Sequence, residues 1–166
     1  MIDASVGGAN SNSYLTLAEA ETYQLSRLDN SAWTGATTDQ KNRALVTASR
    51  LLDEHVKWTG SSNTSTQALQ FPRIDVFDRH GVEFSAEIIP KFLKDATAEL
   101  AMHLLDEDRT KDPDTKGFSE IEAGPISIKV DKFDRRSVIP DSVRAMVQFY
   151  GTVRSSRPSQ ALLMRA

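Results

Sequence analysis

Apolar residues recur at helical spacing in four stretches of the chain, and the strongest stripe follows Pro90. Its members lie about one turn apart, as in a helix with one buried face; they are Phe92, Leu93, Ala96, Leu100 and Leu104. Proline suits the first turn of a helix, where its missing N–H needs no partner. The pattern predicts a helix from Pro90 to Leu105, and we expect it to be the central one.

Capping signals mark two further helices. Thr16 with Glu19, and Thr37 with Gln40, have the spacing of a capping box. In this motif the side chain of each residue accepts a hydrogen bond from the backbone N–H of the other. They predict one helix from residue 16 to about 28 and another from 37 to about 57. Gly60 follows the second helix, where a left-handed residue commonly ends a helix.

A strand and a fourth helix complete the pattern. Residues 126–130 alternate apolar and polar side chains, as in a half-buried strand, and residues 118–121 are placed to pair with them as a hairpin. The last helix begins at Asp141 or Ser142 and ends at Gly151, with apolar residues at Val143, Met146, Val147 and Tyr150. The predicted fold is mainly α: a small bundle of about four helices with a short β-hairpin before the last helix.

The chain has 166 residues, which is the length of one domain. Residues 1–13 are rich in Gly, Asn and Ser and are predicted to be a flexible N-terminal arm. Residues 14–153 form the predicted helical domain, and residues 154–166 form a predicted C-terminal docking tail.

Composition narrows the class of protein. The chain is 39% hydrophobic and 26% charged, as in a globular protein, and its mean hydropathy is −0.40. We expect no membrane association, because no apolar run approaches the ~20 residues that span a bilayer. Since the chain has no cysteine, disulfides and thiolate metal sites are excluded.

Charge is unevenly distributed. Residues 61–120 hold seven Lys/Arg against twelve Asp/Glu, whereas residues 121–166 hold eight against four. The last sixteen residues carry Arg154, Arg157 and Arg165 and no acid. An acidic body with a basic end suits docking on an acidic partner better than general binding to nucleic acid.

No catalytic, cofactor or metal site is predicted. The histidines, His55, His80 and His103, lack the spacing of a ligand set, and the serines have no paired base. Asp75 and Asp78 suggest a polar turn rather than a calcium loop. Glu99 is interpreted as a residue of a solvated helix face.

Two aromatic residues raise a nucleic-acid hypothesis. Trp58 and Phe71 flank a polar loop, and bases of single-stranded nucleic acid stack on such rings. Phosphate contacts are available from Arg43, Arg50, Lys57 and Arg73. The alternative is that both rings pack residues 67–73 against the preceding helix. The acidic character of this region favours the alternative, because affinity for phosphate depends on local positive charge.

Several segments, in their order, resemble a known family. They are Tyr-Leu-Thr-Leu-Ala-Glu-Ala at 14–20, Leu-Asp and Trp near the end of the second helix, Gln-Ala-Leu-Gln-Phe-Pro-Arg at 67–73, and Ala-Glu-Leu-Ala at 98–101 of the helix led by Ile89-Pro90. In this respect the chain resembles the head–tail connectors, or neck adaptors, of tailed bacteriophages. Proteins of this kind are also described as phage DnaT-like proteins that bind single-stranded DNA.

The resemblance implies a structural protein of the virion rather than an enzyme. It implies a homo-oligomeric ring, a dodecamer, between the portal protein and a stopper, tail-terminator or tail protein. Such a ring extends the channel through which genomic DNA passes without specific binding. Its place is the neck of the virion, after assembly in the host cytoplasm. The second hypothesis is an accessory protein that binds single-stranded DNA through Trp58, Phe71 and Arg73.

The predicted tail is a candidate for docking on the portal. Its arginines would pair with acidic groups and its apolar residues would fill a groove; the set is Arg154, Arg157, Leu162, Leu163, Met164 and Arg165. A frayed terminus is the alternative. The loops at 74–87 and 106–116 are candidate contacts for the next neck component, because binding residues favour loops.

Overall fold

A computed structural model describes residues 1–111, 120–123, 126–129 and 137–154. The chain forms two compact units. One, here called the helical unit, consists of Met1–Asp108 and Ile139–Arg154. The other consists of Arg109–Val138 and Ser155–Ala166.

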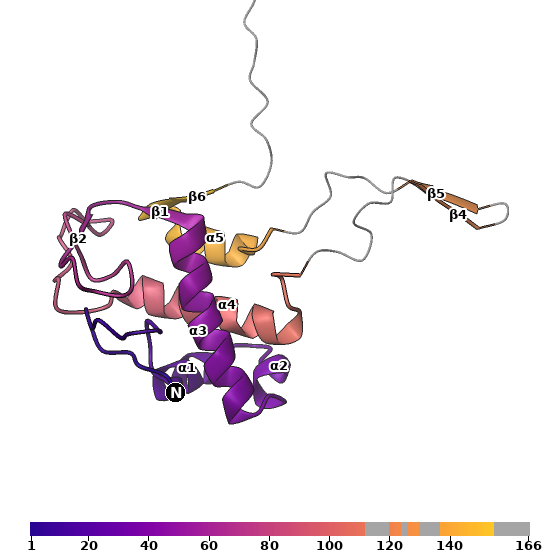
Figure 1. Cartoon of the computed structure of the whole chain (residues 1–166), viewed down its shortest axis with the longest axis horizontal. Helices are drawn as coiled ribbons and strands as arrows, with labels where there is room; N and C mark the ends of the chain where they lie inside the picture. The colour runs from indigo at the N-terminus through magenta and orange to yellow at the C-terminus, as the bar shows by residue number, and fades with distance from the viewer. Residues whose placement is uncertain (112–119, 124–125, 130–136, 155–166) are drawn as a thin grey trace, which may run out of the picture. The chain divides into compact units, whose positions relative to one another are not determined.

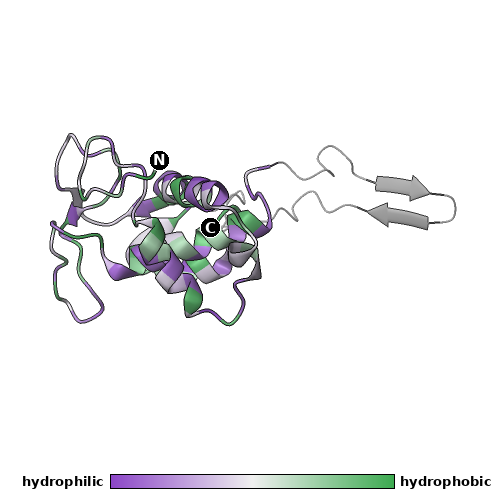
Figure 2. Ribbon diagram, turned by 90° about the horizontal axis from the view of Figure 1, so that it is seen from below, coloured by the Kyte–Doolittle hydropathy of each residue, from purple (hydrophilic) through white to green (hydrophobic). Residues whose placement is uncertain are grey.

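The mainly α fold is confirmed. Within the described residues there are five helices, all in the helical unit: α1 (Leu17–Leu25), α2 (Ser31–Thr34), α3 (Thr38–His55), α4 (Lys91–Asp106) and α5 (Asp141–Val147). Both capping boxes form, at Thr16 with Glu19 and at Thr37 with Gln40. The helices carry apolar and polar segments side by side, as amphipathic helices do (Figure 2).

Helix α4 is the central element, as predicted. It packs against α1, α2, α3 and α5, and α3 crosses it in Figure 1. Leu93, Ala96 and Leu100 are fully buried. Burying an aliphatic side chain of this kind stabilises a fold by roughly 1.5–3 kcal/mol.

The short helix α2 was not predicted. Its four residues are too few to show a helical period. Trp33 holds α2 in place, because its ring is 1% exposed and its Nε1 donates a hydrogen bond to Glu21 Oε2 at 3.1 Å.

A strand pair joins the ends of α3 and α5. Strands β1 (Val56–Trp58) and β6 (Gly151–Val153) are antiparallel, with Lys57 opposite Thr152. Gly151, predicted to end the last helix, lies in this pair opposite Trp58. Three-residue strands cannot show a period of two, so the sequence pattern did not reveal them.

The missing side chain of Gly151 allows β6 to lie close to β1. A Cβ there would lie 2.7 Å from Val56 Cγ1 and 2.9 Å from the Lys57 carbonyl oxygen. We expect Gly151→Ala to lower the free energy of unfolding by about 1–3 kcal/mol, the usual effect of overpacking. Urea denaturation measures it. An unchanged midpoint would contradict this account of the strand pair.

The first thirteen residues, predicted to be a flexible arm, are held by hydrogen bonds. Asn12 N donates to Asp3 O at 2.9 Å, and Ala68 N donates to Gly8 O at 3.1 Å. Ser11 and Ser13 are buried. The composition suggested mobility because it cannot show partners that lie far along the chain.

Two further strand pairs are short. Strands β2 (Ser61–Ser62) and β3 (Arg73–Ile74) pair in the helical unit. The predicted hairpin is present in the second unit, where β4 (Glu120–Ala123) pairs with β5 (Ile126–Lys129). Residues 118, 119 and 130 of the predicted strands lie outside the described residues.

Candidate nucleic-acid interface

The predicted stacking rings, Trp58 and Phe71, come together in the helical unit but are buried. Their centroids are 5.1 Å apart with an edge-to-face angle of 89°. Their exposed fractions are 7% and 2%, and Phe92 lies 6.4 Å from Trp58 and 6.0 Å from Phe71. A base needs an open ring face for stacking. In this conformation the two rings instead hold residues 67–73 against the end of α3.

Asp53 fixes this aromatic cluster. Its carboxylate accepts hydrogen bonds from the Tyr14 hydroxyl, from Gln70 N at 3.0 Å and from Trp58 Nε1 at 3.4 Å. Burial raises the pKa of Asp53 despite these donors, and burial together with the Asp53 charge raises the pKa of Tyr14 well above its usual value. Tyr14 is therefore a protonated donor at neutral pH.

Arg73, the predicted phosphate contact, binds the protein instead. Its Nε donates to Thr59 O and its Nη2 to Gly60 O, both at 2.7 Å, and its Nη1 donates to Gln70 Oε1 at 3.0 Å. The residue is 9% exposed, and desolvation lowers its pKa. Arg73 therefore clamps the loop between β1 and β3, and little of it is left to meet a phosphate.

The remaining predicted cations are exposed on α3 and β1. Arg43 and Arg50 are seven residues apart on α3, so they lie on one helix face about 10 Å apart. Lys57 lies in β1, two residues beyond the end of α3, and is exposed between two buried neighbours. Arg50 also lies 3.7 Å from Glu54, a weak pair because both side chains are more than half exposed.

The β1–β6 pair adds a fourth cation, Arg154. Lys57 is opposite Thr152, so Arg154 is its diagonal neighbour on the exposed face of the pair, at about 7–8 Å. Arg154 N also donates to His55 O at 2.8 Å, which extends the pairing. We call Arg43, Arg50, Lys57 and Arg154 the basic face. The sequence prediction grouped Arg154 with the docking tail. Its proximity to Lys57 could not be seen there, because it depends on the pairing of β1 with β6.

The other members of the predicted docking set lie outside the described residues. They are Arg157, Leu162, Leu163, Met164 and Arg165. Portal docking by this set stays a prediction.

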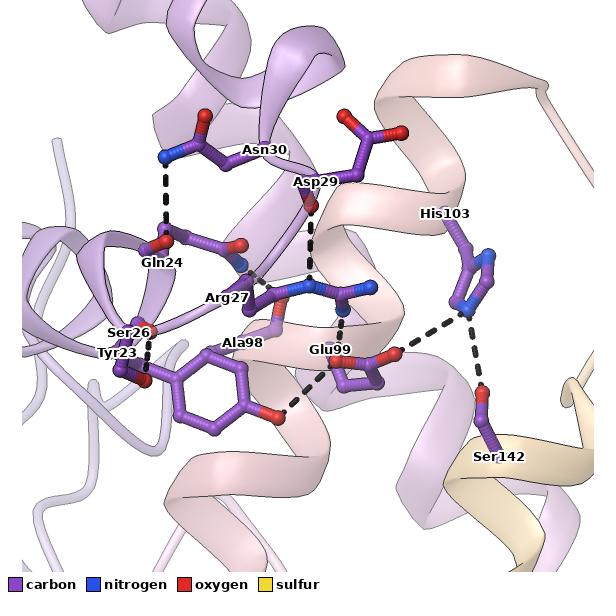
Figure 3. Close-up of polar contacts among 10 residues, drawn as sticks. All are labelled: Tyr23, Gln24, Ser26, Arg27, Asp29, Asn30, Ala98, Glu99, His103 and Ser142. Atoms are coloured by element: carbon purple, nitrogen blue, oxygen red, sulfur yellow. Dashed lines mark hydrogen bonds and ion pairs between the residues drawn. The ribbon is translucent and has the colours of Figure 1, made fainter.

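A second polar cluster centres on Glu99 of α4 (Figure 3). Its carboxylate accepts a hydrogen bond from the Tyr23 hydroxyl at 3.0 Å and forms an ion pair with Arg27. Gln24 Nε2 donates to the adjacent Ala98 carbonyl at 2.7 Å. Glu99 is 7% exposed, so its interpretation as a solvated residue was wrong. The cluster ties α1 to α4.

Glu99, His103 and Ser142 resemble a hydrolase triad only in residue type. His103 Nε2 lies 3.5 Å from Glu99 Oε1 and 3.1 Å from Ser142 Oγ, so one ring nitrogen makes both contacts (Figure 3). A triad needs the acid on one nitrogen and the serine on the other. These contacts join α4 to α5 without that geometry.

Within the described part of the chain, no group of three His, Cys, Asp or Glu side chains could hold a metal ion. In the same residues, no helix combines the length and apolar character that crossing a membrane requires.

The family model described as "Putative DnaT-like ssDNA binding protein" matches residues 1–165. No curated protein and no solved structure matches the chain.

Proposed function

Because this chain belongs to the family of DnaT-like proteins described as binding single-stranded DNA, we propose that it binds single-stranded DNA through the basic face. The observation that carries the proposal is the set of exposed cations Arg43, Arg50 and Lys57 along α3 and β1, to which the β1–β6 pair adds Arg154. These cations lie on one helix and the strand pair that directly follows it, so they can contact successive phosphates of a nucleic-acid backbone.

The negative charge of the helical unit confines DNA binding to the basic face. This unit carries eleven Lys/Arg against seventeen Asp/Glu, a net charge of −6. Phosphate groups are repelled by most of such a surface and attracted where cations gather. With Trp58 and Phe71 buried, the contacts are to phosphates rather than to bases, and we expect little sequence preference.

Salt dependence tests this proposal. Each phosphate contact to a single strand contributes about −0.7 to the slope of log K against log salt concentration. We expect a slope of about −2 to −3 for four contacts on a labelled oligothymidine, measured by fluorescence anisotropy. Replacing Arg43, Arg50 and Lys57 by Gln should remove about 2 from the slope and most of the affinity.

Lys91→Gln is the matched control, because this side chain is 84% exposed on α4 and lies outside the basic face. It should leave the slope unchanged. Equal slopes for the wild type and the triple variant, or no binding at low salt, would contradict the proposal.

A second function, that of a phage head–tail connector, has its own support. The net charge of −6 suits a channel wall that does not hold passing DNA. Exposed apolar side chains at Val82 and Phe149 suit contacts between proteins. We propose it as the alternative: a non-enzymatic ring between portal and stopper or tail in the virion neck.

Quantitative mass spectrometry of purified virus particles, from the genome that encodes the chain, separates the two functions. A connector is expected at a fixed count of about a dozen copies per particle, one closed ring. Absence from particles would exclude the connector, and oligothymidine binding by the basic face would then stand alone.

A further inference from the structure

A groove opens between α1 and the start of α4. Its volume is about 710 Å³, within the range of sites that hold a ligand or a few side chains. The apolar lining comes from Leu15, Tyr23, Ile88 and Ile89. The charged lining is balanced, because Lys94 pairs with Glu19 at 2.5 Å and Lys91 pairs with Asp95. The groove therefore favours an apolar occupant.

An acidic loop leads directly into this groove. Residues 74–88 carry Asp75, Asp78, Glu83 and Glu87 against one cation, Arg79, and end at Ile88 of the groove. Two apolar side chains on the loop, Phe77 and Val82, are 48% and 63% exposed, and Ile88 is 52% exposed. A monomeric protein gains nothing from exposing three large apolar side chains in one loop.

The loop has a defined conformation. Phe77 and Glu83 form an antiparallel bridge, and Asp78 N donates to Val82 O at 2.8 Å. Asp78 Oδ1 accepts the backbone N–H groups of His80 and Val82 at 2.8 and 2.9 Å. A loop ordered in advance loses less entropy when a partner binds.

Residues 155–166 have the matching chemistry. This segment lies outside the described residues; its sequence holds Arg157, Arg165 and the apolar run Leu162–Met164, and no acid. Its charge of +2 is opposite in sign to the charge of −3 on the acidic loop. Leu162, Leu163 and Met164 are of the size that fills an apolar groove.

We propose that the groove and the acidic loop bind residues 155–166 of a second copy of this chain. The two surfaces of the contact differ, so the interface is heterologous, and repeated contacts produce a ring or an open chain of subunits. This inference goes beyond DNA binding. Subunits joined in this way on one strand would bind it cooperatively.

Mixing two defective variants tests the contact. Ile88→Ser alters only the groove and Leu163→Ser alters only residues 155–166. By sedimentation velocity of the full chain without DNA, we expect the wild type to associate with rising concentration and each variant to remain monomeric. A mixture of both should form dimers, because one groove and one binding segment remain intact.

Leu28→Ser is the control, since Leu28 is fully exposed and does not line the groove. It should associate like the wild type. Phe77→Ser, on the loop, replaces Ile88→Ser if the melting temperature of the latter falls. A monomeric wild type, a variant that associates normally, or a mixture that stays monomeric would each overturn the proposal.

Discussion

Replacing Gly60 with alanine is expected to lower the free energy of unfolding by more than about 3 kcal/mol. Gly60 has φ +67°, and a non-glycine residue in this left-handed region costs roughly 1–2 kcal/mol. The added Cβ would also lie 2.2 Å from Ile74 O and 2.8 Å from Val76 Cγ2. A backbone oxygen cannot rotate away, so the loop would separate from β3 and Arg73 would lose its carbonyl partners.

Gly81 provides the matched control. It has φ +81°, yet nothing lies within 4 Å of the Cβ that alanine would add. Gly81→Ala should therefore cost only the conformational part, about 1–2 kcal/mol. Guanidinium denaturation of both variants compares them. Equal losses would show that the close approach to β3 contributes nothing.

Asp53→Ala is expected to lower the free energy of unfolding by about 2–4 kcal/mol. The substitution removes the acceptor for the Tyr14 hydroxyl and for Trp58 Nε1. Each buried donor left without a partner costs about 1–3 kcal/mol. Part of this loss is offset, because the raised pKa of Asp53 indicates that the folded state bears a cost for burying its charge.

The neighbouring Glu54 controls for the loss of a carboxylate on the same helix. Its side chain is 51% exposed and makes one long pair with Arg50, so Glu54→Ala should change stability by less than about 0.5 kcal/mol. Thermal unfolding followed by near-ultraviolet circular dichroism also reports the environment of Trp58. A stable Asp53→Ala variant with an unchanged aromatic spectrum would contradict the role given to Asp53.

Features of the fold that depend on neighbouring residues could be predicted from the sequence, whereas contacts between residues far apart in sequence could not. Capping boxes act within four residues, so Thr16 and Thr37 marked two helices in the sequence. Lys57 meets Thr152 only because two segments about ninety residues apart in sequence pair, and no periodic pattern encodes that contact.

The candidate site shows the same division. Sequence identified Trp58, Phe71 and Arg73 as residues able to bind DNA, but residue type does not give exposure. Arg43, Arg50 and Lys57 were also identified, and the seven-residue spacing of Arg43 and Arg50 could have shown that these two share a helix face. Glu99 was misinterpreted because its partners are distant in sequence: Tyr23 lies on α1 and Arg27 just beyond its end.

The helical unit is discontinuous in sequence, which affects how it can be made. Residues Arg109–Val138 are synthesised between its two parts, so α5 and β6 leave the ribosome thirty residues after the first part ends. Until then α4 lacks the cover of Val143 and Val147, and β1 has an unpaired edge. Until translation passes residue 153, the nascent chain therefore exposes an apolar helix face and an unpaired strand edge, which must be kept from contact with other chains.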